Sequence, residues 1–177
     1  MKTIGTLRTA LFVPATRPDR IDKALGAGAD MVIIDLEDAV AQPLKAEARE
    51  AARKKLIEHA RRKIMVRVNA LGSGHNRKDL ETIVTPSLGG LMLPKVESSE
   101  HVHEIHRRLL EAERHGGMPM GTVGVLALIE SARGVQNVFR IFSEAMDPER
   151  AFTAAFGAAD YSLDLGINMS RDGVELH

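Results

Sequence analysis

Several residue types and patterns are missing from this chain or rare in it. It has no cysteine, no tryptophan and a single tyrosine, which excludes disulfides and thiolate metal sites and argues against an aromatic platform for nucleic-acid bases. Lys+Arg and Asp+Glu both number 24, so overall charge gives the chain no means of attracting nucleic acid. No apolar run reaches membrane-spanning length, and no signal-peptide segment follows Met1. We therefore expect a cytoplasmic protein that binds neither nucleic acid nor membrane.

What the sequence does contain is six short apolar segments, each followed by a helical pattern. Their ranges are 9–13, 31–34, 64–69, 90–96, 123–129 and 151–156. Such alternation indicates an α/β fold with a parallel sheet covered by helices, here as one domain over residues 1–177. Periodicity alone leaves open whether the sheet is a barrel or an open one. A G-x-G-x-x-G motif is absent after the first segment, which weakens the case for dinucleotide binding.

Some helix boundaries are marked by single residues. Pro18 is suited to the first turn of one helix, and Pro43 is expected to open a longer one. Ser98 or Ser99 is expected to cap the helix that follows the fourth strand. The tail over residues 161–177 is polar and punctuated by glycine, so no regular structure is predicted there.

Two carboxylates stand at the ends of consecutive predicted strands. Glu130 ends the fifth apolar segment and Asp160 follows the sixth. Consecutive strands of a parallel sheet are usually neighbours, so both carboxylates would face one rim, where such folds place their chemistry. Two converging carboxylates in a chain without cysteine suit a hard cation such as Mg²⁺. Solvated loop acids or helix caps are an equally weighted alternative.

Charged residues at other strand ends could meet a ligand. Arg67 lies between two valines of the third strand, and a buried arginine needs a carboxylate, either from the protein or from a ligand. The acidic run over residues 35–38, which begins with Asp35, could pair with Arg67 or Lys95, or hold metal-bound waters, although for any single member a capped loop is the favoured interpretation. Arg17 and Lys95 could each meet a phosphate or a carboxylate, and a solvated role is equally plausible for both.

Three histidines, His101, His103 and His106, look at first like a metal cluster. No two of them have the i, i+4 spacing of helical zinc ligands, so a solvent-facing helix is the favoured interpretation. The glycine-containing loop over residues 72–74 resembles a phosphate loop only in its glycine content.

Six motifs together resemble one known family. They lie at residues 11–18, 34–40, 66–69, 93–97, 128–134 and 156–161. In this order they look like the HpcH/HpaI aldolase and citrate lyase β-subunit family, and they are most similar to its CitE-like members. The resemblance runs from about Leu7 to Gly166.

This resemblance implies a TIM (β/α)8 barrel and a reaction. Mg²⁺ would be held by Glu130 and Asp160, and Arg67 would grip a substrate carboxylate. The reaction implied is carbon–carbon cleavage or formation on a 3-hydroxyacyl-CoA such as citryl-CoA, malyl-CoA or citramalyl-CoA, with coenzyme A as part of the substrate. The predicted catalytic residues are Arg67, Glu130 and Asp160, and the predicted substrate-binding residues are Arg67, Arg17, Asp35 and Lys95. A homo-oligomer, a trimer in the family, and citrate lyase subunits are the partners implied.

The chain departs from the family pattern in its length. An eight-stranded barrel typically needs about 250 residues, and this sequence supplies six strands, so we expect a barrel truncated after about six βα units. A C-terminal segment that brings an acid/base aspartate to a neighbouring subunit in the family has no match here. Unpaired edges on the first and sixth strands would favour oligomers or aggregates and leave little lyase turnover.

Two other functions remain open at this stage. One is a CoA-independent aldolase that acts on a 2-oxo acid such as pyruvate or oxaloacetate. The other is a noncatalytic metal-binding, ligand-binding or assembly protein that keeps the metal site.

Overall fold

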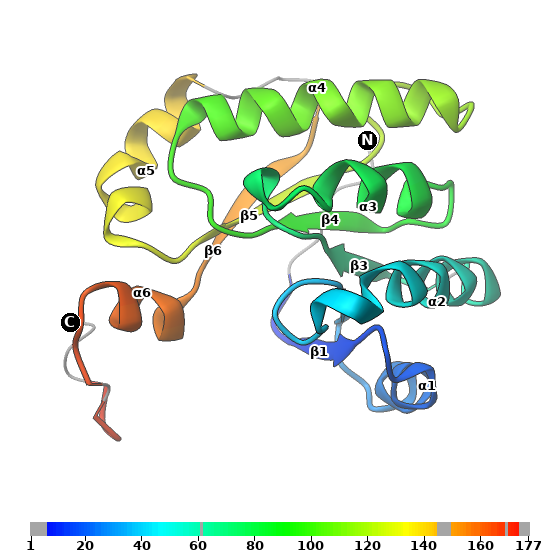
Figure 1. The fold of residues 1–177 in the computed structure, drawn as a ribbon, viewed down its shortest axis with the longest axis horizontal. Helices are drawn as coiled ribbons and strands as arrows, with labels where there is room; N and C mark the ends of the chain where they lie inside the picture. Colours follow the sequence, from blue (N-terminus) through cyan, green and yellow to red (C-terminus); the bar gives the residue numbers. More distant parts are fainter. Residues whose placement is uncertain (1–6, 61, 145–149, 169, 174–177) are drawn as a thin grey trace.

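A computed structural model describes residues 7–60, 62–144, 150–168 and 170–173. It contains one parallel sheet whose six strands follow one another in sequence order, with helices α1 to α5 arranged around its outer face (Figure 1). The strands are β1 (Ala10–Pro14), β2 (Met31–Asp35), β3 (Ile64–Arg67), β4 (Gly90–Leu93), β5 (Val125–Ile129) and β6 (Phe152–Phe156). The helices are α1 (Pro18–Gly26), α2 (Lys45–Glu58), α3 (Asn76–Ile83), α4 (Ser99–His115), α5 (Ala132–Glu144) and α6 (Ala158–Asp164), and 3-10 turns span Gln42–Leu44 and Leu71–Ser73. This is an α/β fold of the TIM-barrel type with six βα units.

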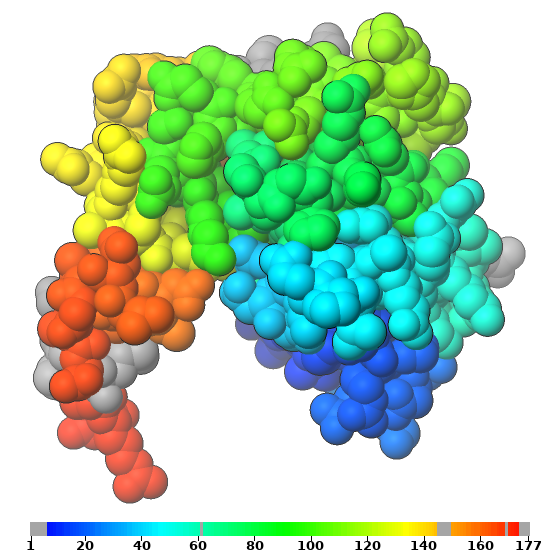
Figure 2. Space-filling model, in the orientation of Figure 1, coloured from blue at the N-terminus to red at the C-terminus, as the bar shows by residue number. Residues whose placement is uncertain are grey.

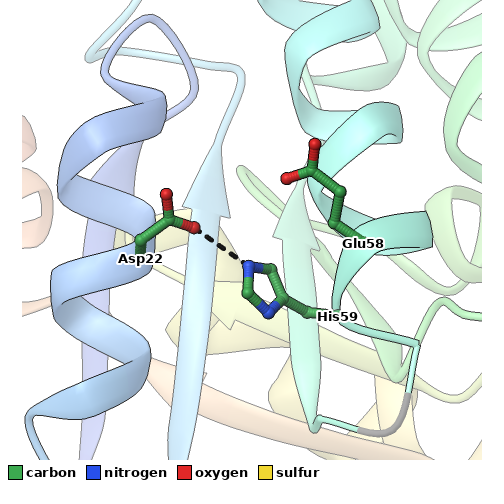
Figure 3. A group of neighbouring side chains, drawn as sticks. All are labelled: Asp22, Glu58 and His59. Atoms are coloured by element: carbon green, nitrogen blue, oxygen red, sulfur yellow. Dashed lines mark hydrogen bonds and ion pairs between the residues drawn. The ribbon is translucent and has the colours of Figure 1, made fainter.

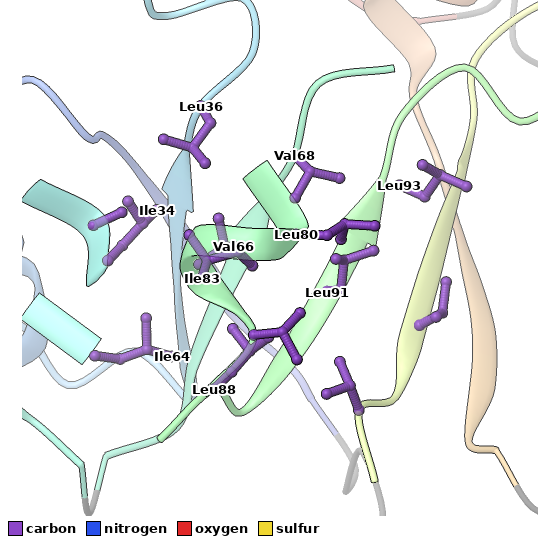
Figure 4. Packing of buried hydrophobic residues seen from close by; sticks show 14 of the residues in the cluster. Ile34, Leu36, Ile64, Val66, Val68, Leu80, Ile83, Leu88, Leu91 and Leu93 are labelled. Atoms are coloured by element: carbon purple, nitrogen blue, oxygen red, sulfur yellow. The ribbon is translucent and has the colours of Figure 1, made fainter. Parts of the chain in front are cut away.

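Strand side chains alternate between two apolar layers. Ile34, Val66 and Leu91 face the helices and belong to the main core, where Leu80 and Ile83 of α3 cover them (Figure 4). The opposite face of the sheet carries a second buried cluster of Met31, Ile33, Met65, Met92 and Leu128. Strands that are apolar on both faces are typical of a parallel sheet with helices on one side and a barrel interior on the other.

Most predicted helix boundaries are found near their expected positions. Pro18 starts α1, and the Ser98 hydroxyl accepts the His101 N–H as the cap of α4. Pro43 lies in a 3-10 turn, and α2 begins only at Lys45. The prediction for the tail was wrong in one respect, because α6 extends into it as far as Asp164.

A buried ion pair lies at the end of the sheet where β5 and β6 begin. Arg150, just before β6, donates to both carboxylate oxygens of Glu113 on α4, at 2.9 Å each. Glu113 also accepts the N–H groups of Gly121 and Val123 ahead of β5, and the Val123 carbonyl accepts a further bond from Arg150. Charges this well satisfied have a structural role, and they lie at the opposite end of the strands from the predicted site.

The two outermost strands carry partly exposed apolar residues. In the described part of the chain β1 pairs only with β2, and β6 pairs only with β5. Phe12 of β1 is 46% exposed and Phe156 of β6 is 51% exposed. Between them, on the inner face, lies an apolar hollow of about 440 Å³. Figure 2 shows a gap between the segment coloured orange-red and the blue and cyan segments.

Helix α5 is only partly covered by the rest of the described chain. Val135, Val138 and Phe139 of α5 are exposed, whereas Ile141 reaches the core and Phe142 packs edge-on against Phe152. In the described ranges, no helix combines the length and apolar content needed to cross a membrane.

Candidate functional site at the carboxyl ends of the strands

Strand alternation carries three charged residues to one rim. On β2, Met31 and Ile33 line the inner face, and the next residue of the same parity is Asp35. On β3, Met65 is followed in the same way by Arg67. Leu128 of β5 is followed by Glu130. The inner face is therefore apolar along its length and charged at the carboxyl ends of the strands.

Asp35 and Arg67 form the most tightly bound pair of this rim. The two residues are register partners across β2 and β3. Arg67 Nε lies 2.8 Å from Asp35 Oδ1, and Nη2 lies 2.6 Å from Oδ2, which is a bidentate contact. The guanidinium also lies over the Phe12 ring, 5.3 Å from its centroid. Burial would raise the pKa of Asp35, but the bonds from Arg67 outweigh it and hold that pKa below its ordinary value.

The rest of the acidic run is shared between two cations. Arg67 Nη1 lies 3.3 Å from Glu37 Oε2 and 3.5 Å from Asp38 Oδ2. Lys95 Nζ lies 2.9 Å from Glu37 Oε1 and 3.6 Å from Asp38 Oδ1. Nη1 is thus the least engaged edge of the Arg67 guanidinium, and the Lys95 side chain remains 49% exposed. These are the two positions at which a ligand carboxylate could find a cation.

Lys45 holds the loop after β2 in place, a role that the sequence analysis missed. Its ammonium is buried and donates to the carbonyls of Leu36 and Glu37 at 2.7 Å each. Asp35 supports the same loop by accepting the N–H groups of Glu37 and Ala39. This role could not be predicted, because nothing in the local sequence distinguishes Lys45 from the exposed charged residues of α2.

Glu130 is buried at the end of β5, being 5% exposed. Its Oε1 accepts the N–H of Lys95 at 2.8 Å. Asp160 lies within hydrogen-bonding reach of Glu130, from the first turn of α6 rather than from the strand end as predicted. Burial, together with repulsion from Asp160 and Glu37, raises the pKa of Glu130 to about 7 against the lowering effect of the Lys95 amide.

The arrangement of Glu130 and Asp160 fits a hard cation. Both carboxylates line a cavity of about 750 Å³ at the rim, which Lys95 and Asp38 also line. Gly157 passes directly beneath Glu130, since a methyl group there would lie 2.6 Å from Glu130 Cβ and 3.0 Å from Oε2. The donors are all oxygen atoms, as Mg²⁺ prefers, and the cavity leaves room for the waters that it usually keeps.

Other predicted residues lie elsewhere or have structural partners. Arg17 contacts Asp19 on the surface and does not line the rim cavity. Among the three histidines, His103 is exposed as expected, but His101 lines the rim cavity and His106 accepts a bond from Arg150. Gly72 lines the same cavity.

A buried network that the sequence analysis missed supports the loop after β3. Arg49 donates to Asp79 at 2.6 Å, and the other oxygen of Asp79 accepts both the main-chain and side-chain N–H groups of Asn69. Asn76 in turn donates to the Asn69 carbonyl. These contacts fix the start of the loop that forms one wall of the rim cavity.

A second group of titratable side chains, two acids and a histidine, lies between α1 and α2 (Figure 3). Asp22, Glu58 and His59 form the one group of three possible metal ligands, counting His, Asp and Glu, in the described chain whose ligand atoms lie within 4.8 Å of one another. The Lys55 ammonium already contacts Asp22 at 2.8 Å and Glu58 at 2.9 Å. We interpret this group as a surface ion-pair cluster that joins the two helices.

Comparison with known proteins finds relatives of this chain in one family. A family model described as HpcH/HpaI aldolase/citrate lyase matches residues 8–177. The citrate lyase subunit beta of Leuconostoc mesenteroides subsp. cremoris is 34% identical over 171 residues, which are 96% of this chain and 56% of that protein. The L-malyl-CoA/beta-methylmalyl-CoA lyase of Cereibacter sphaeroides is 29% identical over 171 residues, covering 94% of this chain and 52% of that protein.

A solved structure extends the comparison to three dimensions. The citrate lyase beta subunit of M. tuberculosis, complexed with oxaloacetate and magnesium, superposes with a TM-score of 0.73 at 33% identity, covering 98% of this chain and 69% of that one. The chain spans little more than half the length of the curated relatives it matches. Its fold, its motifs and its match over residues 8–177 place it in the HpcH/HpaI aldolase/citrate lyase family.

Proposed function

We propose that this chain carries the metal and carboxylate site of a Mg²⁺-dependent carbon–carbon lyase. The substrate would be a 3-hydroxyacyl-CoA such as citryl-CoA, malyl-CoA or citramalyl-CoA, and the products acetyl-CoA and a 2-oxo acid. The observation that carries this proposal is the meeting of Glu130 and Asp160 in one rim cavity. The names of the relatives support the reaction class, since they include citrate lyase and malyl-CoA lyase.

Each rim residue would have a distinct role. Glu130 and Asp160 would hold Mg²⁺, which when bound supplies a Lewis acid for the oxygen of a 2-hydroxy or 2-oxo acid. Arg67 would orient the substrate carboxylate through Nη1, the edge that Asp35 does not occupy. The exposed ammonium of Lys95 would supply a second positive charge at the same rim. The coenzyme A thioester would stabilise the enolate that cleavage releases.

The wider setting of the protein is also a proposal. A homo-oligomer is supported by the exposed apolar residues of β1 and β6, and the family resemblance suggests a trimer. Citrate lyase subunits are further candidate partners, since one relative is a subunit of that enzyme. A cytoplasmic location accords with the composition of the chain.

Turnover assays with Mg²⁺ and each of the three CoA thioesters would test the function. We expect little cleavage by the 177 residues alone and clear cleavage by a version extended at its C-terminus, because the open edges of the sheet leave the inner wall incomplete. Cleavage of a 2-oxo acid without coenzyme A would instead indicate the aldolase alternative. Metal-linked binding of oxaloacetate without turnover by either version would indicate a noncatalytic protein.

Arg67→Lys should weaken oxaloacetate binding although the charge is kept. Lysine cannot form the planar fork that engages Asp35 while leaving one edge for a ligand. Loss of a charged hydrogen bond corresponds to about 1.5–3 kcal/mol, or about 10- to 150-fold in Kd by calorimetry. Arg17→Lys is the matched control, since Arg17 lies outside the rim cavity. The Kd of this variant for oxaloacetate should equal that of the parent. Equal Kd values in the parent and both variants would show that Arg67 does not bind the substrate.

A further inference from the structure

The backbone at Lys95 has an unusual conformation. Lys95 has a φ of 55°, and it is the one non-glycine residue in the described ranges with a positive φ. Left-handed backbone is disfavoured for residues that carry a Cβ, and where it persists the surrounding structure must hold it. Lys95 lies two residues beyond Leu93, the last residue of β4, and it lines the rim cavity.

The hydrogen bonds on either side show that Lys95 is a bulge. Leu93 is the register partner of Ala127, so in a regular parallel ladder the Lys95 N–H would bond to the Leu128 carbonyl. That carbonyl instead accepts the N–H of the next residue, Val96, at 3.2 Å. One extra residue has therefore been inserted, and the Lys95 N–H is released from the ladder.

The released N–H has a specific acceptor. It donates to Glu130 Oε1 at 2.8 Å. With Oε1 held in this way, Oε2 lies above Gly157, where a methyl group would come within 3.0 Å of it. The bulge thus determines which oxygen of Glu130 accepts the main-chain N–H of Lys95 and which lies against Gly157.

The side chain of Lys95 connects the bulge to the loop that follows β2. Its ammonium lies 2.9 Å from Glu37 Oε1, and Glu37 is itself buried. Glycine would adopt the left-handed backbone more readily, but it could not make this contact. The ion pair therefore compensates for the disfavoured conformation by anchoring the residue that adopts it.

We propose that Lys95 is a positioning residue for Glu130, acting through its backbone. Its bulged left-handed conformation directs the amide at Oε1 and thereby sets the carboxylate for metal binding, while the Lys95–Glu37 ion pair holds the backbone in that conformation. This inference rests on the proposed metal site at Glu130 and Asp160.

Two substitutions that both remove the ammonium separate the backbone role from the charge. Lys95→Met keeps the length of the side chain but loses the anchor, so the backbone should relax and the amide should leave Glu130. Lys95→Gly also loses the anchor, but it reaches the left-handed region at no steric cost. We expect Lys95→Met to weaken Mn²⁺ binding about 10-fold, at the lower end of the effects of outer-shell residues, and Lys95→Gly to restore affinity to within about 3-fold of the parent.

The sign of this result distinguishes positioning from electrostatics. Removing a positive charge from the rim would by itself strengthen the binding of a cation. A loss of affinity in Lys95→Met therefore has no Coulombic explanation, and rescue by glycine has no explanation in lost side-chain contacts. Equal affinities in the parent and Lys95→Met, or equal losses in both variants, would overturn the inference.

Nuclear magnetic resonance gives a readout that does not depend on metal binding. The amide proton of residue 95 should resonate downfield in the parent and in Lys95→Gly, and upfield in Lys95→Met. Circular dichroism of each variant checks the fold. If the parent binds no Mn²⁺, the proposed metal site fails, but the amide shifts still test the positioning of Glu130. Shifts that are alike in the two variants would reject it.

Discussion

Glu130→Gln or Asp160→Asn is expected to abolish Mg²⁺-linked binding of oxaloacetate and leave the fold intact. Each substitution removes one of the two carboxylates that meet in the rim cavity. The loss should exceed the roughly 10- to 100-fold effect of residues outside the first coordination shell. Calorimetry with and without Mg²⁺, beside circular dichroism, measures both parts of this expectation.

Metal-free Glu130→Gln should also differ from the parent in its pH dependence. Burial, with Asp160 and Glu37 nearby, raises the pKa of Glu130 to about 7. The folded parent then binds more protons than the unfolded chain between the ordinary glutamate pKa of about 4.3 and about 7, so its stability falls as pH rises through that window. The glutamine variant has no such group, and its melting temperature should lack this decline.

Asp38→Asn is the matched control for charge. Asp38 lines the same cavity as Glu130 and Asp160 and contacts Arg67 and Lys95, but its side chain is 53% exposed. Its loss removes one rim charge without removing a proposed ligand, and the affinity should change by no more than about 3-fold, as expected for a screened surface charge. Unchanged binding in Glu130→Gln and Asp160→Asn, or an equally large loss in Asp38→Asn, would rule out the assigned ligands.

Arg150→Met should cause the largest loss of stability. The side chains of Arg150 and Glu113 are 4% and 0% exposed, so the substitution leaves a carboxylate in the interior without its cation. Removing one partner of a buried pair typically costs about 3–5 kcal/mol, which for a chain of this size lowers Tm by roughly 10 °C. Thermal denaturation followed by circular dichroism measures it.

The effect of Arg150→Met should depend on pH in one direction. Burial would raise the pKa of Glu113, but the bonds from Arg150 and from two main-chain N–H groups outweigh it and lower the pKa. The pair therefore stabilises the parent above the ordinary glutamate pKa, and this contribution is lost as pH falls through the lowered value. The stability gap between parent and variant should narrow in acid.

An exposed pair provides the comparison for Arg150→Met. Arg140 and Glu144 on α5 have side-chain exposures of 67% and 44%, and Arg140→Met should leave Tm nearly unchanged, because exposed ion pairs stabilise a fold little. If Arg150→Met were as mild as Arg140→Met, the buried pair would not stabilise the base of the sheet.

The sheet was predictable because each strand is a short apolar run with a clear end. The positions of Asp35, Arg67 and Glu130 at the rim follow from the same pattern, since period-2 alternation carries the last inward residue to the carboxyl end of its strand. A serine cap at Ser98 or Ser99 was also predictable, because serine is among the preferred residues at the N-terminus of a helix. These features depend only on near neighbours in the sequence.

What could not be predicted depends on contacts between distant segments. Lys45 and Arg49 look like solvated residues of an amphipathic helix, yet both side chains are buried. Lys45 donates to main-chain carbonyls and Arg49 donates to Asp79. The bulge at Lys95 has no local signal either, since glycine is the residue that marks left-handed backbone. Asp160 was placed at a strand end because the start of α6 lacks a side-chain cap to announce it.

The position of β6 has a consequence for the dynamics of the site. Glu130 follows β5, which is paired on both sides, whereas Asp160 follows β6, which has a neighbour on one side only in the described sheet. Amide hydrogen exchange should therefore be faster in β6 than in β5, because outer strands open at lower free energy. A ligand that bridges both carboxylates would couple this less protected strand to a more protected one. Binding of such a ligand would stabilise the closed state of β6. Amide exchange along β6 should then slow even at residues that the ligand does not contact.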